Sequence, residues 1–252
     1  MDETKFSVGK TYISRTNPED AIRRVTEAAL KGQGGYICVS NMRMVQYAEE
    51  HPEYNQLMKD SFMNWPDGRP LSWCGRMWGL KEVRCTSGPS TFMKMMSNPN
   101  PQLKHFLLGD TQDVLDEIVN TYHDAGIVGS YSLPFTDVDK FDYEGISNMV
   151  KESGANVVWT AMTAPKQDEF DQRLLPYLPN AVLIGVGRAF RISIGRVKDA
   201  PEWAKKMGVG GMYIGRKSKP QLLLWYFKKT FTLLSYYASI IWRRITGKKY
   251  YA

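Results

Sequence analysis

The sequence predicts an α/β fold, a parallel β-sheet with helices on both faces, followed by an amphipathic helical appendage. Short apolar runs alternate with stretches of helical periodicity from about residue 35 to residue 190. Several of these runs end in small residues, at Gly109, Gly129 and Gly187. A basic, aromatic segment begins near Pro220. Alternating strands and helices are typical of a parallel sheet covered on both sides.

The composition excludes several classes of protein. A chain of 252 residues can bury a full core. Its three cysteines lack the number and spacing of a disulfide framework or zinc site, and its three histidines lie far apart. The N-terminal Met1–Thr4 is acidic and no apolar run follows, so we expect no signal peptide. The sequence therefore predicts a cytoplasmic protein without a metal site.

Charge divides the chain into two parts. The net charge is +7, yet no Asp or Glu follows Glu202, whereas 11 of the 33 Lys and Arg residues do. The first 202 residues thus carry 22 basic and 26 acidic side chains, a net charge of −4. We therefore expect a core at 1–203 and a basic appendage at 204–252. We expect an anionic binding partner for the appendage only.

The first half of the chain has clear start and stop signals. Asn17-Pro18 supplies an N-cap and a proline for the first helical position. The strand at 36–39 runs into Ser40-Asn41, which can cap the next helix. Helices are also expected at 53–59, 69–78 and 91–96. In the second half the expected strands are 104–108, 127–131, 156–162 and 181–186, and the expected helices follow Thr111 and span 143–151 and 166–175.

The turn at 64–68, Asn-Trp-Pro-Asp-Gly, is expected to carry the chemistry. Pro66 cannot donate to a sheet ladder and Gly68 tolerates a positive φ, so a strand should end here in a tight turn. A carboxylate at the end of a buried strand is where α/β proteins often place chemistry. The alternative is a turn aspartate that bonds its own backbone. Asp67 is our candidate catalytic residue.

The small residues at the strand ends predict a nucleotide crevice. Gly109 and Gly187 would let phosphates approach the backbone and the following helix N-termini. The sequence has no GxGxxG fingerprint and no P-loop. An oxidoreductase that uses NAD is therefore disfavoured.

The segment from Pro220 to Trp242 is expected to form a long amphipathic helix. Its longest uncharged stretch, 230–242, has 13 residues, whereas a membrane span needs about 20. An aromatic, basic helix of this kind fits an anionic membrane surface. A core helix or a homo-oligomer helix is the alternative, and a nucleic-acid arm is disfavoured. The expected membrane-binding residues are Trp225, Lys228, Lys229, Trp242, Arg243 and Arg244.

Several short motifs occur together in a specific order. They are Val39-Ser40-Asn41, Trp65-Pro66-Asp67-Gly68, Arg84–Pro89, Leu107-Leu108-Gly109, Ile127–Phe135, Ala164-Pro165-Lys166-Gln167, Val186–Phe190 and Ala200–Trp203. With them, from about Gly35 to about Pro220, the chain resembles the WecG/TagA/CpsF family, glycosyltransferase family 26. The resemblance implies an inverting, metal-independent sugar transfer from a nucleotide donor to a lipid-diphosphate-linked sugar. It also implies a Rossmann-like fold and a basic appendage on the cytoplasmic face of the membrane.

The resemblance assigns roles residue by residue. Asp67 falls on the family's proposed catalytic base, and burial under Trp65 or Trp73 would raise its pKa. The remaining expected substrate-binding residues are Ser40, Asn41, Arg84, Gly109, Lys166, Gln167, Gly187 and Arg191. Arg84, Arg191 or Arg216 could neutralise the donor diphosphate.

The sequence departs from the family pattern at several positions. Asp168 replaces the usual Glu, and Arg191 replaces the usual Asp. Lys198-Asp199 and 210–214 differ as well. These changes affect the expected identity of the donor sugar and the way in which the C-terminal appendage would close over the site.

The predicted function is transfer of a sugar from a UDP-sugar to a polyprenyl-diphosphate-linked glycan. UDP-N-acetylmannosamine and a UDP-hexose are both open as donors, and no metal cofactor is expected. The alternative is a non-catalytic, nucleotide-binding scaffold subunit of an envelope polysaccharide assembly complex.

Overall fold

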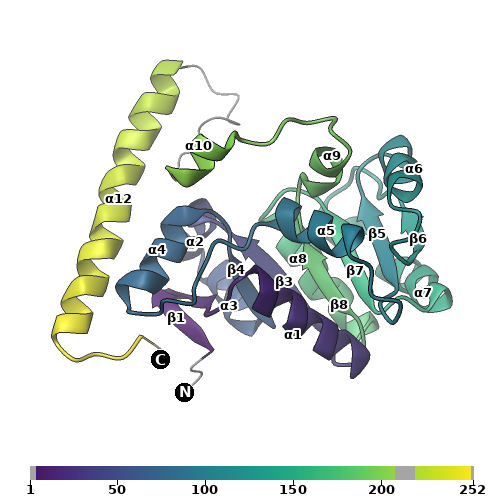
Figure 1. The fold of residues 1–252 in the computed structure, drawn as a ribbon, viewed down its shortest axis with the longest axis horizontal. Coiled ribbons are helices and arrows are strands. Elements are labelled where there is room, and N and C mark those ends of the chain that lie inside the picture. The colour runs from purple at the N-terminus through teal and green to yellow at the C-terminus, as the bar shows by residue number, and fades with distance from the viewer. Residues whose placement is uncertain (1–3, 208–218, 251–252) are drawn as a thin grey trace.

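The computed structural model describes residues 4–207 and 219–250, and all of their side chains except those of 205, 206 and 219–230. Its centre is a six-stranded parallel sheet with the strand order β4-β3-β8-β7-β5-β6 (Figure 1). The strands are β3 (Gly35–Ser40), β4 (Met63–Pro66), β5 (His105–Gly109), β6 (Ile127–Tyr131), β7 (Val157–Ala161) and β8 (Val182–Gly185). The predicted fold class is confirmed.

Helices cover both faces of this sheet. One face packs against α2 (Met42–Glu50), α3 (Pro52–Asp60), α7 (Tyr143–Ser153) and α8 (Lys166–Leu174). The other packs against α1 (Pro18–Leu30), α5 (Gly88–Ser97), α6 (Gln112–Thr121) and α9 (Ala189–Ser193). In β7, Val158 joins the first core while Val157 and Trp159 join the second. This alternation is the two-residue period of a strand buried on both sides.

A hairpin that we did not predict covers one edge of the sheet. β1 (Lys5–Val8) and β2 (Thr11–Ser14) pair in antiparallel fashion, and β2 lies beside β4. The backbone N–H of Asn64 donates to Ser14 Oγ at 2.9 Å, and its side-chain amide donates to Tyr12 O at 2.9 Å. The hairpin thus satisfies polar groups that an open edge strand would leave unpaired.

Three further elements complete the fold. α4 (Arg69–Met77) follows β4 directly, α10 (Glu202–Lys206) is short, and α12 (Lys219–Ile245) is about 40 Å long. Two short 3-10 turns span Val138–Lys140 and Leu175–Tyr177. Figure 1 shows α12 along one side of the molecule, beside α4. None of the described helices has the length and apolar character to cross a membrane.

The C-terminal half of α12 is part of the folded core. Tyr236 and Ile240 are buried in the core that also contains Phe6 and Cys74. After the helix, the carbonyl of Tyr250 accepts a hydrogen bond from the Ser7 N–H at 2.8 Å. The first strand and the described segment after α12 therefore lie close together (Figure 1). The expected division into 1–203 and 204–252 stays a prediction.

Candidate active site

The loops that follow the six strands gather at one edge of the sheet, which we call the carboxyl edge. Because all strands are parallel, this edge receives Asp67 after β4, Asn41 after β3, Gly187 after β8, Gln167 after β7 and Asp110 after β5. α6 and α8 follow the neighbouring strands β5 and β7 but lie on opposite faces. Ligands of open α/β sheets bind at such switch points.

Asp67 lies in the tight turn that the sequence predicts. Its backbone N–H donates to Ser40 O at 2.8 Å and to Trp65 O at 2.9 Å, and its residue is partly buried. Gly68 follows with a φ of 85°, and its N–H donates to Cys85 Sγ at 3.2 Å. The turn is therefore fixed by the strand beside it and by the segment before α5.

The two tryptophans expected near Asp67 differ in their surroundings. Trp65 is fully buried in the core beneath α1 and α5, so its ring packs inside the protein. Trp73 is partly buried on α4, the helix that begins immediately after the Asp67 turn.

Asn41 caps α2, as the sequence predicts. Its side-chain oxygen accepts from Arg43 N at 3.0 Å and Met44 N at 3.4 Å. This orientation leaves the amide nitrogen to donate to a ligand. The neighbouring Ser40 hydroxyl is buried and has no hydrogen-bond partner among the described residues.

Gln167 joins two loops of the carboxyl edge. It is only 4% exposed, and its side-chain oxygen accepts from Met162 N at 3.0 Å and Gly187 N at 2.8 Å. Gly187 itself has a φ of 57°, a conformation that glycine adopts without a steric cost. The structure therefore places Gln167 between the loops that follow β7 and β8.

Lys166 points towards the loop between β6 and α7. Its ammonium donates to the carbonyl of Thr136 and lies 5.5 Å from the centre of the Phe135 ring and 5.3 Å from that of Phe141. The Phe135 side chain is fully exposed. Lys166 thus holds a loop at the carboxyl edge, next to the expected nucleotide crevice.

Asp110 and Arg191 form a two-point ion pair at the end of β5. Arg191 Nε donates to Asp110 Oδ1 at 2.9 Å and Oδ2 at 3.0 Å, and Arg191 Nη2 donates to Oδ1 at 2.7 Å. These hydrogen bonds raise the pKa of the Arg191 guanidinium. Asp110 has a φ of 60°, a left-handed conformation uncommon outside glycine, and follows Gly109 at 101°. A Cβ on Gly109 would lie 2.9 Å from Ala161 O, so that position requires glycine.

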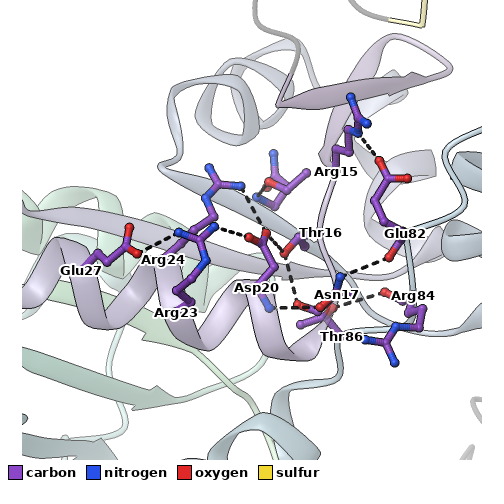
Figure 2. Close-up of polar contacts among 12 residues, drawn as sticks. Arg15, Thr16, Asn17, Asp20, Arg23, Arg24, Glu27, Glu82, Arg84 and Thr86 are labelled. Atoms are coloured by element: carbon purple, nitrogen blue, oxygen red, sulfur yellow. Dashed lines mark hydrogen bonds and ion pairs between the residues drawn. The ribbon is translucent and has the colours of Figure 1, made fainter.

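Arg84 pairs with an acid on α1. Its guanidinium donates to Glu19, which also binds Lys94 at 3.0 Å. Figure 2 shows how the segment before α5 is bound to the start of α1, where Asn17 donates to Glu82 O at 3.3 Å. A donor diphosphate would have to compete with Glu19 for Arg84.

Sequence reasoning missed Arg188, an exposed cation at the centre of the carboxyl edge. It directly follows Gly187, at the end of β8, and its side chain forms no ion pair within the described part of the chain. Arg43 lies nearby at the start of α2 and donates to Ala164 O at 3.3 Å. The signal for Arg188 was its place in the motif Val186–Phe190.

Two carboxyl groups are buried beneath this edge, on α8. Asp168 accepts from the Tyr54 hydroxyl, and Asp171 accepts from Thr160 Oγ1 at 2.9 Å. Burial raises the pKa of Asp168 to about 6 and raises that of Asp171 as well. Through Tyr54, Asp168 connects α3 to the helix that carries Gln167.

The expected membrane-binding residues face in different directions. Arg243 donates to Ser7 Oγ at 3.0 Å and lies 5.3 Å from the centre of the Trp78 ring, and Arg244 donates to Met77 O at 2.8 Å. Trp242, in contrast, is 68% exposed. The side chains of Trp225, Lys228 and Lys229, and the whole of Arg216, lie outside the described residues.

Exposed apolar side chains form a stripe on α12. We call it the outer apolar face, and it consists of Phe231, Leu234, Ile241, Trp242 and Ile245. Their exposed fractions range from 47% to 76%. Scattered apolar residues are ordinary on protein surfaces, but a contiguous stripe indicates an interaction surface.

Comparison with known proteins identifies the family of this chain. The model of the Glycosyl transferase WecG/TagA/CpsF family matches residues 6–246. A Bacillus subtilis (strain 168) protein, N-acetylglucosaminyldiphosphoundecaprenol N-acetyl-beta-D-mannosaminyltransferase, is 23% identical over 225 residues, 86% of this chain and 83% of the relative. A solved structure of unliganded arylmalonate decarboxylase shares 11% identity, with coverage of 74% of this chain and 94% of that one. Its TM-score of 0.26 supports no conclusion about fold or function. Because the family match covers nearly the whole chain, this protein belongs to the WecG/TagA/CpsF family and is a glycosyltransferase.

Proposed function

We propose that this enzyme transfers N-acetylmannosamine from its UDP-activated form to a polyprenyl-diphosphate-linked N-acetylglucosamine, with inversion and without a metal. The observation that carries the proposal is the position of Asp67 at the carboxyl edge of a chain matched by this family over residues 6–246. The Bacillus relative is named as an N-acetyl-beta-D-mannosaminyltransferase that acts on N-acetylglucosaminyldiphosphoundecaprenol. A UDP-hexose remains the second donor to test.

Asp67 is the proposed general base. Its carboxylate would take the proton of the acceptor hydroxyl while that oxygen forms a bond to the anomeric carbon of the donor. The bond from the anomeric carbon to the diphosphate oxygen breaks on the opposite side, so UDP leaves and the anomeric configuration inverts. The rigid turn around Asp67 favours this role, because the base must be held in place before the reaction.

The leaving diphosphate needs positive charge or hydrogen-bond donors. Arg84 and Arg191, our two expected candidates among the described residues, both pair with carboxylates. Arg188 is the better placed cation, because it lies at the end of the central strand β8 and has no acidic partner in the described structure. The Asn41 amide nitrogen, one strand closer to Asp67, would donate to a sugar hydroxyl.

The outer apolar face of α12 would bring the enzyme to its lipid-linked acceptor. An exposed tryptophan and aliphatic side chains fit the boundary between headgroups and acyl chains. The exposed Lys248 and Lys249, just beyond the helix, would add attraction to an anionic inner leaflet.

The decisive experiment measures sugar transfer to a short-chain polyprenyl-diphosphate N-acetylglucosamine from a panel of UDP-sugars, with and without EDTA. We expect the highest turnover with UDP-N-acetylmannosamine, no loss with EDTA, and an inverted linkage in the product. Asp67→Asn should keep UDP binding but lose nearly all turnover. Full turnover in that variant would reject Asp67 as the base, and UDP binding without turnover on any acceptor would favour a scaffold.

A further inference from the structure

The order of the strands places a second acid far from the reacting centre but on the same edge. Asp67 follows β4 and Asp110 follows β5, with β3, β8 and β7 between them. Neighbouring strands lie about 4.8 Å apart, so the ends of β4 and β5 are roughly 19 Å apart. Asp110 therefore cannot touch an acceptor hydroxyl that Asp67 deprotonates.

A donor that lies along this edge would reach Asp110 with its other end. If its anomeric carbon is near Asp67, its diphosphate lies over the middle strands, where Arg188 is exposed. The nucleoside then extends towards the switch point between β7 and β5. A carboxylate repels phosphate but accepts hydrogen bonds from hydroxyl and imide N–H groups.

Asp110 is held firmly enough to recognise such groups. Its side chain is 8% exposed, and Arg191 donates hydrogen bonds to both carboxylate oxygens. The Thr111 N–H donates to Oδ1 at 2.8 Å, and the Ser132 hydroxyl donates to the Asp110 carbonyl at 2.8 Å. Its left-handed backbone costs free energy, and such residues persist mainly where the surroundings determine them. Oδ2 accepts only from Arg191 Nε among the described residues and retains a free lone pair.

We propose that Asp110 is a specificity-determining residue that accepts a hydrogen bond from the nucleoside of the donor, and that Arg191 positions it. The family resemblance places an acid at position 191, and in this chain the carboxylate of Asp110, from the end of β5, lies against Arg191. The inference rests on the proposed UDP-sugar donor and adds which residue recognises the nucleoside of that donor.

The test measures binding by calorimetry of UDP, 2′-deoxy-UDP, 3′-deoxy-UDP and N3-methyl-UDP to the full chain. The deoxy analogues report on the ribose hydroxyls and the methylated analogue on the base. A hydrogen bond to a charged group corresponds to about 10- to 100-fold in affinity. We expect the wild-type protein to bind at least one analogue that much more weakly than UDP.

Asp110→Asn and Asp110→Gly should reduce this discrimination to about twofold, since both residues tolerate the left-handed backbone. Arg191→Gln should reduce it in part and Arg191→Lys less, with the melting temperature of each variant recorded. Asp113→Asn, an exposed acid on the next helix that pairs with Arg196, is the matched control and should discriminate like the wild type.

The outcomes separate this inference from the proposed function. Unchanged discrimination in Asp110 variants that still transfer sugar would overturn the inference alone, as would a wild-type protein that binds all four ligands equally. A wild-type protein that fails to bind UDP would overturn both the inference and the proposed donor.

Discussion

The side-chain oxygen of Gln167 accepts a hydrogen bond from the backbone N–H of Gly187 at 2.8 Å. The same oxygen accepts from Met162 N, so one buried side chain joins two loops of the candidate active site. The sequence predicted Gln167 as a substrate-binding residue. The observed contacts favour a role in positioning the loops, which mutagenesis can separate from direct binding.

Replacing Gln167 with Met should destabilise the fold as well as the site. Two partly buried N–H groups, those of Met162 and Gly187, would lose their acceptor, at about 1–3 kcal/mol each, so the free energy of unfolding should fall by roughly 2–6 kcal/mol. Urea unfolding and steady-state kinetics on the same samples measure this. Gln112→Met, at an exposed glutamine on α6, is the control. Unchanged stability with a raised KM for the donor would instead indicate direct binding.

Arg188→Ala should weaken donor binding. Removal of an exposed cation from the proposed diphosphate position is expected to raise the KM for the UDP-sugar about tenfold, in line with a charge-assisted hydrogen bond. The difference should shrink at high salt, because exposed charges are screened. Arg23→Ala, which removes an exposed arginine from α1, controls for net charge. Equal KM values for Arg188→Ala and wild type would remove Arg188 from the mechanism.

Asp168 should make stability depend on pH. A free aspartate titrates near 3.9, and burial raises the pKa of Asp168 to about 6, so the fold favours the protonated form. As pH rises from about 4 to 6, the unfolded chain loses this proton first. The contribution of Asp168 to the free energy of unfolding should therefore fall across that window, by roughly 3 kcal/mol, and stay constant above it.

Asp168→Asn isolates this contribution, because the amide oxygen can still accept from Tyr54. We expect the stability of the variant relative to wild type to rise from pH 4 to pH 6 and then level off. His105, whose pKa burial lowers to about 4, acts in the opposite direction in both proteins and cancels in the comparison. Asp116→Asn on the surface of α6 is the control, and parallel stability curves for Asp168→Asn and wild type would contradict the assignment.

The outer apolar face of α12 should bind membranes. Trp242→Ser together with Ile245→Ser is expected to lower partitioning onto anionic vesicles by at least tenfold, since each side chain buries apolar area worth about 1.5–3 kcal/mol. The melting temperature should change little, because both side chains are exposed. Arg243→Ala provides the contrast: its contacts with Ser7 and Trp78 predict lost stability with vesicle binding largely kept. Undiminished vesicle binding by the double variant would leave an oligomer interface as the role of this face.

The sequence predicted most of the sheet because its strands are short, apolar and followed by turn residues. The strand at 127–131 was predicted with its observed bounds, and Asn17 and Asn41 cap helices as expected. The N-terminal hairpin was missed, since its two four-residue strands carry little periodic signal. For the site, the turn at Asp67 followed from local backbone chemistry.

The contacts of four arginine side chains could not be predicted from the neighbouring sequence. Arg84 and Arg191 have acidic partners 65 and 81 positions away, and nothing in the neighbouring residues indicates those pairs. Arg243 and Arg244 lie on a helix whose two sides are both apolar, so composition alone could not show which side packs inward. Tertiary packing decided the direction of all four side chains.

The burial of Tyr236 and Ile240 changes how the C-terminal region should be dissected. A chain cut before Pro220 would expose the apolar surface of α4 that these residues cover. We therefore expect the truncated chain to aggregate or to lose conformational stability. The proposed membrane contact and the packing of the core thus belong to opposite sides of a single helix. Detachment of this helix would therefore remove the proposed membrane contact and expose part of the core at the same time.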